Sequence, residues 1–483
     1  MRHRVGDDES SARDADGESV TSGIAILLHG FGPRYDLPIA RALYLYAAGG
    51  VVFLSFVLVV LFAGEKVGDR AISYPRRAVP WLVPLARSPW PRIVGGVIGV
   101  VALVAVVITG LFGPSNNFHN PAEYIVWIFF WAMTVILSGL VGNLWYLLNP
   151  WAAIYDAVTR FVRVRPRRKL PNVGVWPAVA AYLSFACLEL TSGMASRPFA
   201  VAISALVYTV ITLAGMLRYG RDEWLQHCEA FTVLFSVVAR FAPIETERDE
   251  TGAISAVYLR PWGFGLLKNA PIGWDWVVFV ILMLSSLAFD GVSATPAWQD
   301  FTVAFKPFWL PLGAFGLFLE RTLGLILLTV GFLLIFIAFM EAVIYLGQRK
   351  VDVKATVATF ALTLVPIALV YNAAHNYSYI LVNSQYFIPL LNDPLGKGWH
   401  LLPALANFKP NFGLAQASTV WYADIVLIVL GHIIAVFLSH LRAGERFRTA
   451  QRALLSQYPM LVLMVMYTMT SLWILSQPVT RGS

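Results

Sequence analysis

The sequence predicts an all-α fold, a polytopic transmembrane helix bundle of about ten spans, on two observations. Of 483 residues, 58% are hydrophobic and only 13% are charged, and the mean hydropathy is +0.66. Soluble globular chains are about 45–50% apolar and about 25% charged. The second observation is a series of apolar stretches near the roughly 20 residues that cross a bilayer core. Together these observations exclude a soluble globular protein, a disordered chain, a coiled coil and a nucleic-acid-binding protein.

Ten stretches qualify as spans, and an eleventh segment, 223–243, is less apolar. The ten are residues 40–63, 93–112, 123–147, 174–191, 198–217, 275–290, 322–347, 355–382, 418–440 and 457–476. If both termini lie outside, the inner loops hold 25 of the 36 Lys and Arg residues, and cations concentrate on the cytoplasmic side. We therefore expect ten spans in the cell (inner, or cytoplasmic) membrane. Segment 223–243 is then a cytoplasmic-side re-entrant or interfacial helix; eleven spans is the alternative.

The remaining segments define the domain organisation. Residues 1–22 are polar and predict a disordered tail, whereas 23–479 predict one transmembrane helical domain. Residues 244–262 alternate in a strand-like way and predict a small cytoplasmic hairpin. Six cations within residues 160–169 indicate an anchor to lipid headgroups, so the lipid bilayer, and not nucleic acid, is the expected partner. Cys187 and Cys228 have no disulfide spacing and are expected to be small core residues.

Charged and imidazole side chains in or beside the spans are the candidates for function. A charge at the centre of a spanning helix costs at least about 2.5–3.5 kcal/mol. The predicted topology gathers Glu189, Asp290 and His375 in the outer half of the membrane, where outer segments add His29, Asp36 and His400. Glu123 and Asp424 are expected to be headgroup-level residues or carboxylates at helix N-termini, which the helix dipole favours, and His119 is expected in a solvated turn. The other membrane-embedded candidates are Glu229, Glu341, His432 and His440.

This residue set favours two kinds of chemistry. Imidazole and carboxylate ligands on the oxidising face suit a divalent metal such as Zn or Cu. The same groups also suit a proton or cation pathway through the membrane. No phosphate-binding glycine loop, dinucleotide fingerprint, nucleophile elbow or zinc-protease motif occurs in the sequence.

A series of short motifs runs through almost the whole chain after residue 25. They are His29-Gly30, Asp36-Leu37-Pro38, Asn149-Pro150-Trp151, Leu188-Glu189-Leu190, Glu229-Ala230-Phe231, Phe289-Asp290-Gly291, Ala374-His375, Gln385-Tyr386, Asp393-Pro394, Gly431-His432 and Ser456-Gln457-Tyr458-Pro459-Met460. In order and spacing the set resembles the bacterial integral-membrane proteins labelled fenitrothion hydrolase.

The resemblance implies a membrane-bound, metal-dependent organophosphorus hydrolase that works with a second, related membrane subunit. It implies metal ligation by His29 and His375, with His400 as a further ligand, and roles for Asp36 and Asp290 as catalytic carboxylates or as groups that orient the ligands. The chain departs from the family pattern at Asn372, where members often carry another His. Without this second His, the chain lacks one imidazole that the family often has, which weakens the implied metal site.

Three hypotheses therefore stand side by side. The first is a protein with a metal-binding or hydrolytic site on the outer face. The second is a transporter of a small solute, proton or metal ion, with Glu189, Asp290 and His375 at the outer entrance and Glu229, Glu341 and His440 further in. The third is a scaffold subunit of a membrane complex, favoured by the 14% aromatic content and the small residues in the spans. The sequence does not name the small-molecule ligand.

Overall fold

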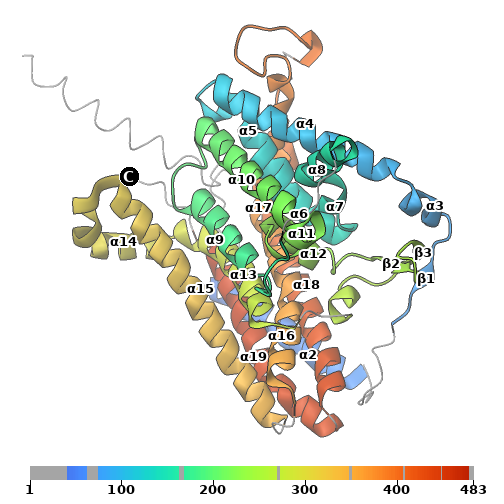
Figure 1. Ribbon diagram of the computed structural model, residues 1–483. Coiled ribbons are helices and arrows are strands. Elements are labelled where there is room, and N and C mark those ends of the chain that lie inside the picture. The colour runs from blue at the N-terminus through green and yellow to red at the C-terminus, as the bar shows by residue number, and fades with distance from the viewer. Residues whose placement is uncertain are drawn as a thin grey trace, which may run out of the picture.

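The computed structural model describes residues 41–62, 74–162, 168–268, 272–347, 351–405, 408–447 and 449–477, and they form a helical bundle with one small sheet (Figure 1). The predicted tail therefore lies outside the described residues. The α-helices are α2 (Arg41–Phe62), α3 (Leu82–Arg87), α4 (Trp90–Phe112), α5 (Pro121–Glu123), α6 (Thr134–Leu140), α7 (Trp145–Leu148), α8 (Pro150–Phe161), α9 (Trp176–Leu190), α10 (Pro198–Tyr219), α11 (Arg221–His227), α12 (Ala230–Val238), α13 (Trp274–Ser293), α14 (Pro296–Trp309), α15 (Gly313–Leu346), α16 (Val353–Ala361), α17 (Val365–Leu390), α18 (Ala417–Arg446) and α19 (Ala450–Leu475). Short 3-10 turns are η2 (Asn117–His119), η4 (Phe264–Leu267), η5 (Leu310–Leu312), η6 (Leu362–Leu364), η7 (Pro403–Leu405) and η8 (Phe412–Ala415), and η3 (Tyr124–Met133) is a π-helix.

The predicted membrane bundle is confirmed. Within the described residues, eight helical segments are long and apolar enough to cross a membrane, and two shorter apolar helices, Leu45–Leu58 and Trp176–Leu190, accompany them. Each of the ten predicted stretches coincides with one of these segments. The helix that corresponds to the sixth stretch, α13, runs from Trp274 to Ser293 and is longer than the apolar run. It includes Asp275 near its start and Asp290 near its end.

Segment 223–243 is broken into two short helices. Helix α11 has 7 residues and α12 has 9, with the break at Cys228 and Glu229. Neither helix is long enough to cross a bilayer core, which takes about 20 residues. Helix α12 is nevertheless buried along most of its length, through residues such as Val233, Leu234 and Phe235. The segment thus dips into the bundle without crossing it, as a re-entrant helix does.

Glycines let α4 approach its neighbours closely. A Cβ at Gly99 would overlap the backbone carbonyl of Leu148, and one at Gly110 would lie 2.6 Å from the carbonyl of Pro198. Small residues at such positions allow helix backbones to pack tightly in a membrane, where no hydrophobic effect drives helices together. The loop that contains α7 and the start of α10 therefore pack directly on α4.

Two irregular helical segments shape the centre of the bundle. The predicted span 123–147 is largely the π-helix η3, an uncommon geometry that is found mostly at functional sites. The predicted span 355–382 divides into α16 and α17, joined by the turn η6, with Pro366 in the first turn of α17. Proline lacks an N–H and starts a helix well, so it marks this break.

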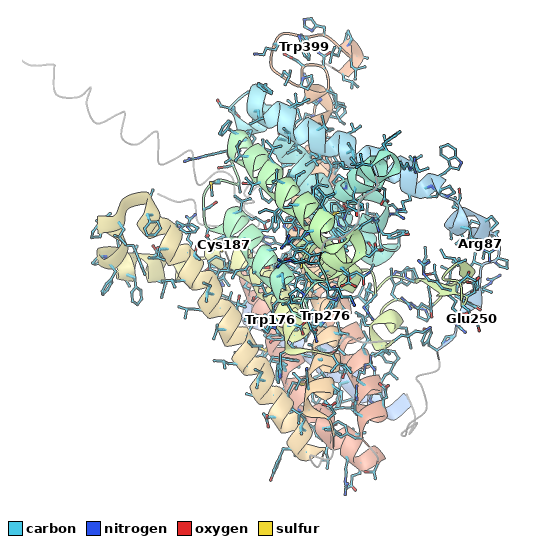
Figure 2. The ribbon with its side chains drawn as sticks, in the orientation of Figure 1. Arg87, Trp176, Cys187, Glu250, Trp276 and Trp399 are labelled. Atoms are coloured by element: carbon cyan, nitrogen blue, oxygen red, sulfur yellow. The ribbon has the colours of Figure 1, made fainter. Side chains whose placement is uncertain are left out.

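The predicted hairpin is confirmed and acquires a third strand. Strands β2 (Ile244–Arg248) and β3 (Ile254–Leu259) pair antiparallel, with Thr246 opposite Val257, and β1 (Arg77–Ala78) adds to the other edge of β3. The Asp249 carboxylate closes the turn by accepting from the backbone N–H groups of Thr251 and Ala253. Figure 2 shows Arg87 and Glu250 together beside this sheet, and Trp399 far from them on the loop after α17. We call the region of the sheet and of residues 261–268 the sheet end.

Glu245 ties the sheet to the bundle. Its side chain is 5% exposed and accepts from Tyr74 Oη at 2.8 Å and Lys268 Nζ at 2.5 Å, while Arg260 Nη1 lies 3.4 Å away. Burial by itself would raise the pKa of the Glu245 carboxyl. The hydrogen bonds from Lys268 and Tyr74 and the charges of Arg260 and Lys268 outweigh burial and lower that pKa below its ordinary value.

Replacing Glu245 by Ala is expected to lower the stability of the purified protein by about 3 kcal/mol, because it leaves Arg260 buried without a counter-charge. Glu247→Ala is the matched control. Its pair with Arg76 is partly exposed and is worth up to about 1 kcal/mol. Thermal unfolding in detergent measures both, and equal losses would contradict the anchoring role.

The same carboxyl makes the wild-type stability depend on pH. A group whose pKa is lowered by folding stabilises the fold above its unfolded pKa, about 4.3 for Glu, and loses that effect as the pH falls through the lower folded pKa. The melting temperature of Glu245→Gln should therefore fall less steeply below about pH 4.3 than that of the wild type.

Candidate functional site

A paired histidine and aspartate lie where helices α13 and α17 meet. His375 Nε2 is 2.9 Å from Asp290 Oδ2, and both side chains are 11% exposed. Tyr371 lies one turn before His375 on α17, and its ring stacks on the imidazole with centroids 5.7 Å apart. The two helices are distant in sequence, so only the packing of the bundle makes the pair.

Glu189 of α9 adds a second carboxylate beside this pair. Its charge interacts with that of Asp290, and the indole of Trp131, from the π-helix η3, hydrogen-bonds to it. Among the described residues, no Lys or Arg forms an ion pair with Glu189. We call Glu189, Asp290 and His375 the acid–imidazole cluster. Because like charges disfavour each other's ionised form, the interaction between Glu189 and Asp290 favours a proton or a cation beside them.

Glu123 and Asp424 are two further carboxyl groups with buried oxygens, and Glu123 lies in the first turn of α5, as expected of a helix N-terminal carboxylate. Glu123 is buried and accepts from Trp127 Nε1 at 2.8 Å, while its Oε1 has no partner among the described residues. Asp424 Oδ1 is likewise buried and unpartnered there. Tyr379 interacts electrostatically with Glu123, Glu189 and Asp290, and Tyr371 with Asp290 and Asp424. Glu123 and Asp424 each follow a helix start by a few residues, and packing of the neighbouring helices then covers them.

A cavity of about 660 Å³ opens at the end of α17, and none of Glu189, Asp290 and His375 lines it. Its walls come from the loop after α4, the last turns of α17 and the loop beyond them, through Phe118, His119, Tyr124, Tyr386, Asp393 and Phe412, among others. Val382, the first of its wall residues along α17, follows His375 by seven residues, about 10 Å along the helix. The walls are mainly aromatic and apolar, which suits a small, largely apolar molecule.

Asp393 shapes the cavity rim and is bound within its own turn. Its carboxylate accepts from the backbone N–H groups of Lys397 and Gly398 at 2.8 and 2.7 Å. Partial burial works against its ionised form, yet these N–H groups and that of Trp399 lower the pKa of Asp393 below its ordinary value. The predicted outer turn is therefore a structured rim, and its carboxylate is satisfied locally.

The structure brings three of the predicted site residues together and separates the others. Glu189, Asp290 and His375 form the cluster. His29 and Asp36 lie outside the described residues. His400 is exposed on the loop after α17, near Asp393, and His119 is exposed at the cavity, as expected of a solvated turn.

The remaining membrane-embedded candidates have other surroundings. Glu229 caps α12: its carboxylate accepts from the N–H groups of Phe231 and Thr232 and from Tyr208 Oη at 2.7 Å. Glu341 is exposed on α15. His440 contacts Gln457 through Nδ1 at 2.7 Å, and the buried His432 binds the carbonyl of Ile428 through Nδ1 at 2.8 Å.

The described residues of the acid–imidazole cluster supply only part of a metal site. In the part of the chain that the structure describes, no group of three or more His, Cys, Asp or Glu side chains is arranged to hold a metal ion. Asn372, which stands where a second His would resemble the family, donates weakly to the carbonyl of Ala132 at 3.5 Å and accepts from Asn376. A metal at the cluster therefore needs at least one further ligand besides those described.

Sequence reasoning missed the aromatic residues that hold the cluster. Tyr371 was detectable, because it precedes His375 by four residues and so shares its helix face. Tyr379 was detectable in the same way, because it follows His375 by four residues. Trp131 carried no such signal: its contact with Glu189 depends on the π-helix and on helix packing, neither of which a single-sequence pattern specifies.

Comparison with protein families, with curated proteins and with solved structures gives no match. The fold and the site themselves define the class: the chain is a multi-pass helical membrane protein with a largely buried pair of His375 and Asp290 between two of its helices.

Glu229 and Glu341 are both candidates from the sequence, but their replacement by Ala should affect the stability of the protein differently. Glu229→Ala removes the acceptor for two backbone N–H groups and the Tyr208 hydroxyl, and is expected to cost about 3 kcal/mol or more of stability. Glu341→Ala, on an exposed face, should change stability by about 0.5 kcal/mol or less. Thermal unfolding in detergent distinguishes them; a stable Glu229→Ala protein would show that the cap is dispensable.

Proposed function

We propose that this chain acts on a small molecule at the outer face of the cell membrane, through a cation-binding, hydrolytic site centred on His375 and Asp290. The observation that carries the proposal is the 2.9 Å pair of His375 and Asp290, held in an apolar bundle about 10 Å along α17 from an aromatic cavity. The outer location rests on the uneven distribution of Lys and Arg along the sequence.

The histidine and aspartate suit the acceptance of a proton. A carboxylate bound to Nε2 holds the proton of a neutral imidazole on that nitrogen, which makes Nδ1 the basic one. The same carboxylate stabilises the imidazolium after it takes up a proton. A water molecule or ligand hydroxyl close to this ring would be deprotonated by general-base catalysis, which typically contributes about 10²–10⁴-fold to a rate.

The neighbouring carboxylates support the binding of a cation. Glu189 interacts with Asp290 at close range, and in the described residues no Lys or Arg forms an ion pair with Glu123, Glu189 or Asp424. A divalent ion such as Zn²⁺ or Cu²⁺ is the candidate that the resemblance to fenitrothion hydrolase-like proteins suggests. In that view His29 and Asp36 complete the ligand set, and a related membrane subunit joins the complex.

We expect His375→Ala and Asp290→Asn to weaken the binding of Zn²⁺ or Cu²⁺ at least tenfold, because each removes a ligand or its orienting partner. Both variants should also lower the hydrolysis of an aryl phosphotriester by at least about 10²-fold. Isothermal titration in detergent and metal analysis of the purified protein measure binding, and product release from membrane vesicles measures hydrolysis.

His227→Ala provides the control, because His227 is an exposed histidine that contacts Glu223 at the opposite side of the bundle. It should leave both readouts unchanged. A wild-type protein that binds neither ion and hydrolyses no phosphotriester would overturn the proposal, as would a His375→Ala variant that matches the wild type.

A second candidate function, transfer of a proton or metal ion across the membrane, is favoured by helix α18. It carries Asp424, His432 and His440 at intervals of two turns, or about 12 Å. Asp424 Oδ1 and His432 Nε2 are buried without partners among the described residues. Buried polar atoms of this kind are commonly satisfied by internal water, and a water chain along α18 would connect the acid–imidazole cluster with the other side.

This candidate predicts that proteoliposomes take up protons faster than empty vesicles, and that Asp424→Asn and His432→Phe reduce the uptake to background. An internal pH-sensitive dye provides the measurement, with His119→Phe, in the exposed turn, as the control. Uptake equal to that of empty vesicles would exclude the transport candidate and leave the hydrolytic one standing.

A further inference from the structure

Five cations from distant parts of the chain converge at the sheet end. Arg240 follows α12, Arg260 follows β3, Lys268 follows η4, and Arg442 and Arg446 lie in the last turns of α18. They gather around the turn at 261–268. Arg240 Nη1 donates to the carbonyl of Lys268 at 2.8 Å, and Arg442 Nη2 donates to that of Leu266 at 3.1 Å. We call these five residues the cation cluster.

The cation cluster carries more positive charge than its carboxylates neutralise. Glu245 is shared by Arg260 and Lys268, and Glu445 pairs with Arg442 at 2.5 Å. Among the described residues these two carboxylates are outnumbered by the five cations, and Glu245 is also shared with Arg76, at 3.9 Å. Burial and the charges of Arg260 and Arg442 lower the pKa of Arg240, as expected where guanidinium groups crowd together.

Donor groups in the cation cluster also lack acceptors. The side chain of Arg442 is only 3% exposed, yet its Nε has no hydrogen-bond partner among the described residues, and neither does the buried Nε of Arg446. A buried charged donor without an acceptor is costly. An anion with several oxygens would satisfy both donors and the charge excess together.

We propose that the cation cluster binds a phosphate group, either the headgroup phosphate of an anionic phospholipid or a free phosphate. Guanidinium forks match the geometry of phosphate oxygens, and this match makes Arg the preferred residue for binding them. Arg442 lies 18 residues after Asp424 on α18, about 27 Å along the helix, so this site is separate from the acid–imidazole cluster. It lies where α18, one of the helices long and apolar enough to cross a membrane, ends.

The test measures the melting temperature of the full-length protein in detergent with three additions: phosphatidylglycerol, inorganic phosphate and phosphatidylcholine. A ligand that binds the folded state stabilises it in proportion to its occupancy. Phosphatidylglycerol should raise the melting temperature and phosphatidylcholine should not. Stabilisation by phosphatidylglycerol alone identifies a lipid headgroup as the ligand, and equal stabilisation by inorganic phosphate identifies free phosphate.

The variants Arg446→Gln and Arg240→Gln test the assignment. Each removes one guanidinium and should weaken binding roughly tenfold, which a titration of the melting temperature against lipid detects. Arg248→Gln is the matched control: Arg248 is an exposed guanidinium of the same sheet that binds only the carbonyl of Gly252, and it should bind like the wild type. Because Arg442 is buried and Arg442→Gln risks unfolding, the two less buried arginines carry the test.

Two results would overturn the proposal. One is the absence of stabilisation by either phosphate source. The other is equal binding by Arg446→Gln, Arg240→Gln and Arg248→Gln, which would indicate attraction by general positive charge only.

Discussion

The cost of an unsatisfied polar group in an apolar interior governs this structure. A membrane core offers no water to backbone N–H and C=O groups, so the spans are helices, which pair those groups internally. The same cost directs each buried carboxylate to donors. Glu229 is satisfied by the start of α12, and Glu245 by Tyr74, Lys268 and Arg260. Where partners are missing among the described residues, as at Glu123 and Asp424, the chain retains polar groups that folding alone does not explain.

The polar groups of the bundle form two separate regions of opposite charge. Acidic groups and His375 gather between α9, α13 and α17, whereas arginines crowd around residues 261–268. Helix α18 joins them, with Asp424 near its start and Arg442 near its end. The first region suits a cation or a proton and the second suits an anion. Because the two regions are separate, a cation or proton at the first would not compete with an anion at the second.

Composition and periodicity were sufficient to predict the bundle and the hairpin. Each depends on a local property: the apolar length of a span or the alternation of a strand. The prediction also grouped Glu189, Asp290 and His375, since span direction alone brings them to one side. It failed to give Glu123 and Asp424 their buried surroundings, because burial depends on which helices pack over a given turn.

The sequence by itself determined that this is a multi-pass membrane protein and which few charged residues its apolar segments carry. The scarcity of charge in a chain that is 58% hydrophobic leaves few ways to arrange those segments in a bilayer. Only the tertiary structure decided which of those residues meet. His375 and Asp290 are 85 residues apart, and Arg442 is 176 residues from Leu266, whose carbonyl it binds. Such contacts arise from helix packing, which is a property of the whole bundle and not of any local pattern.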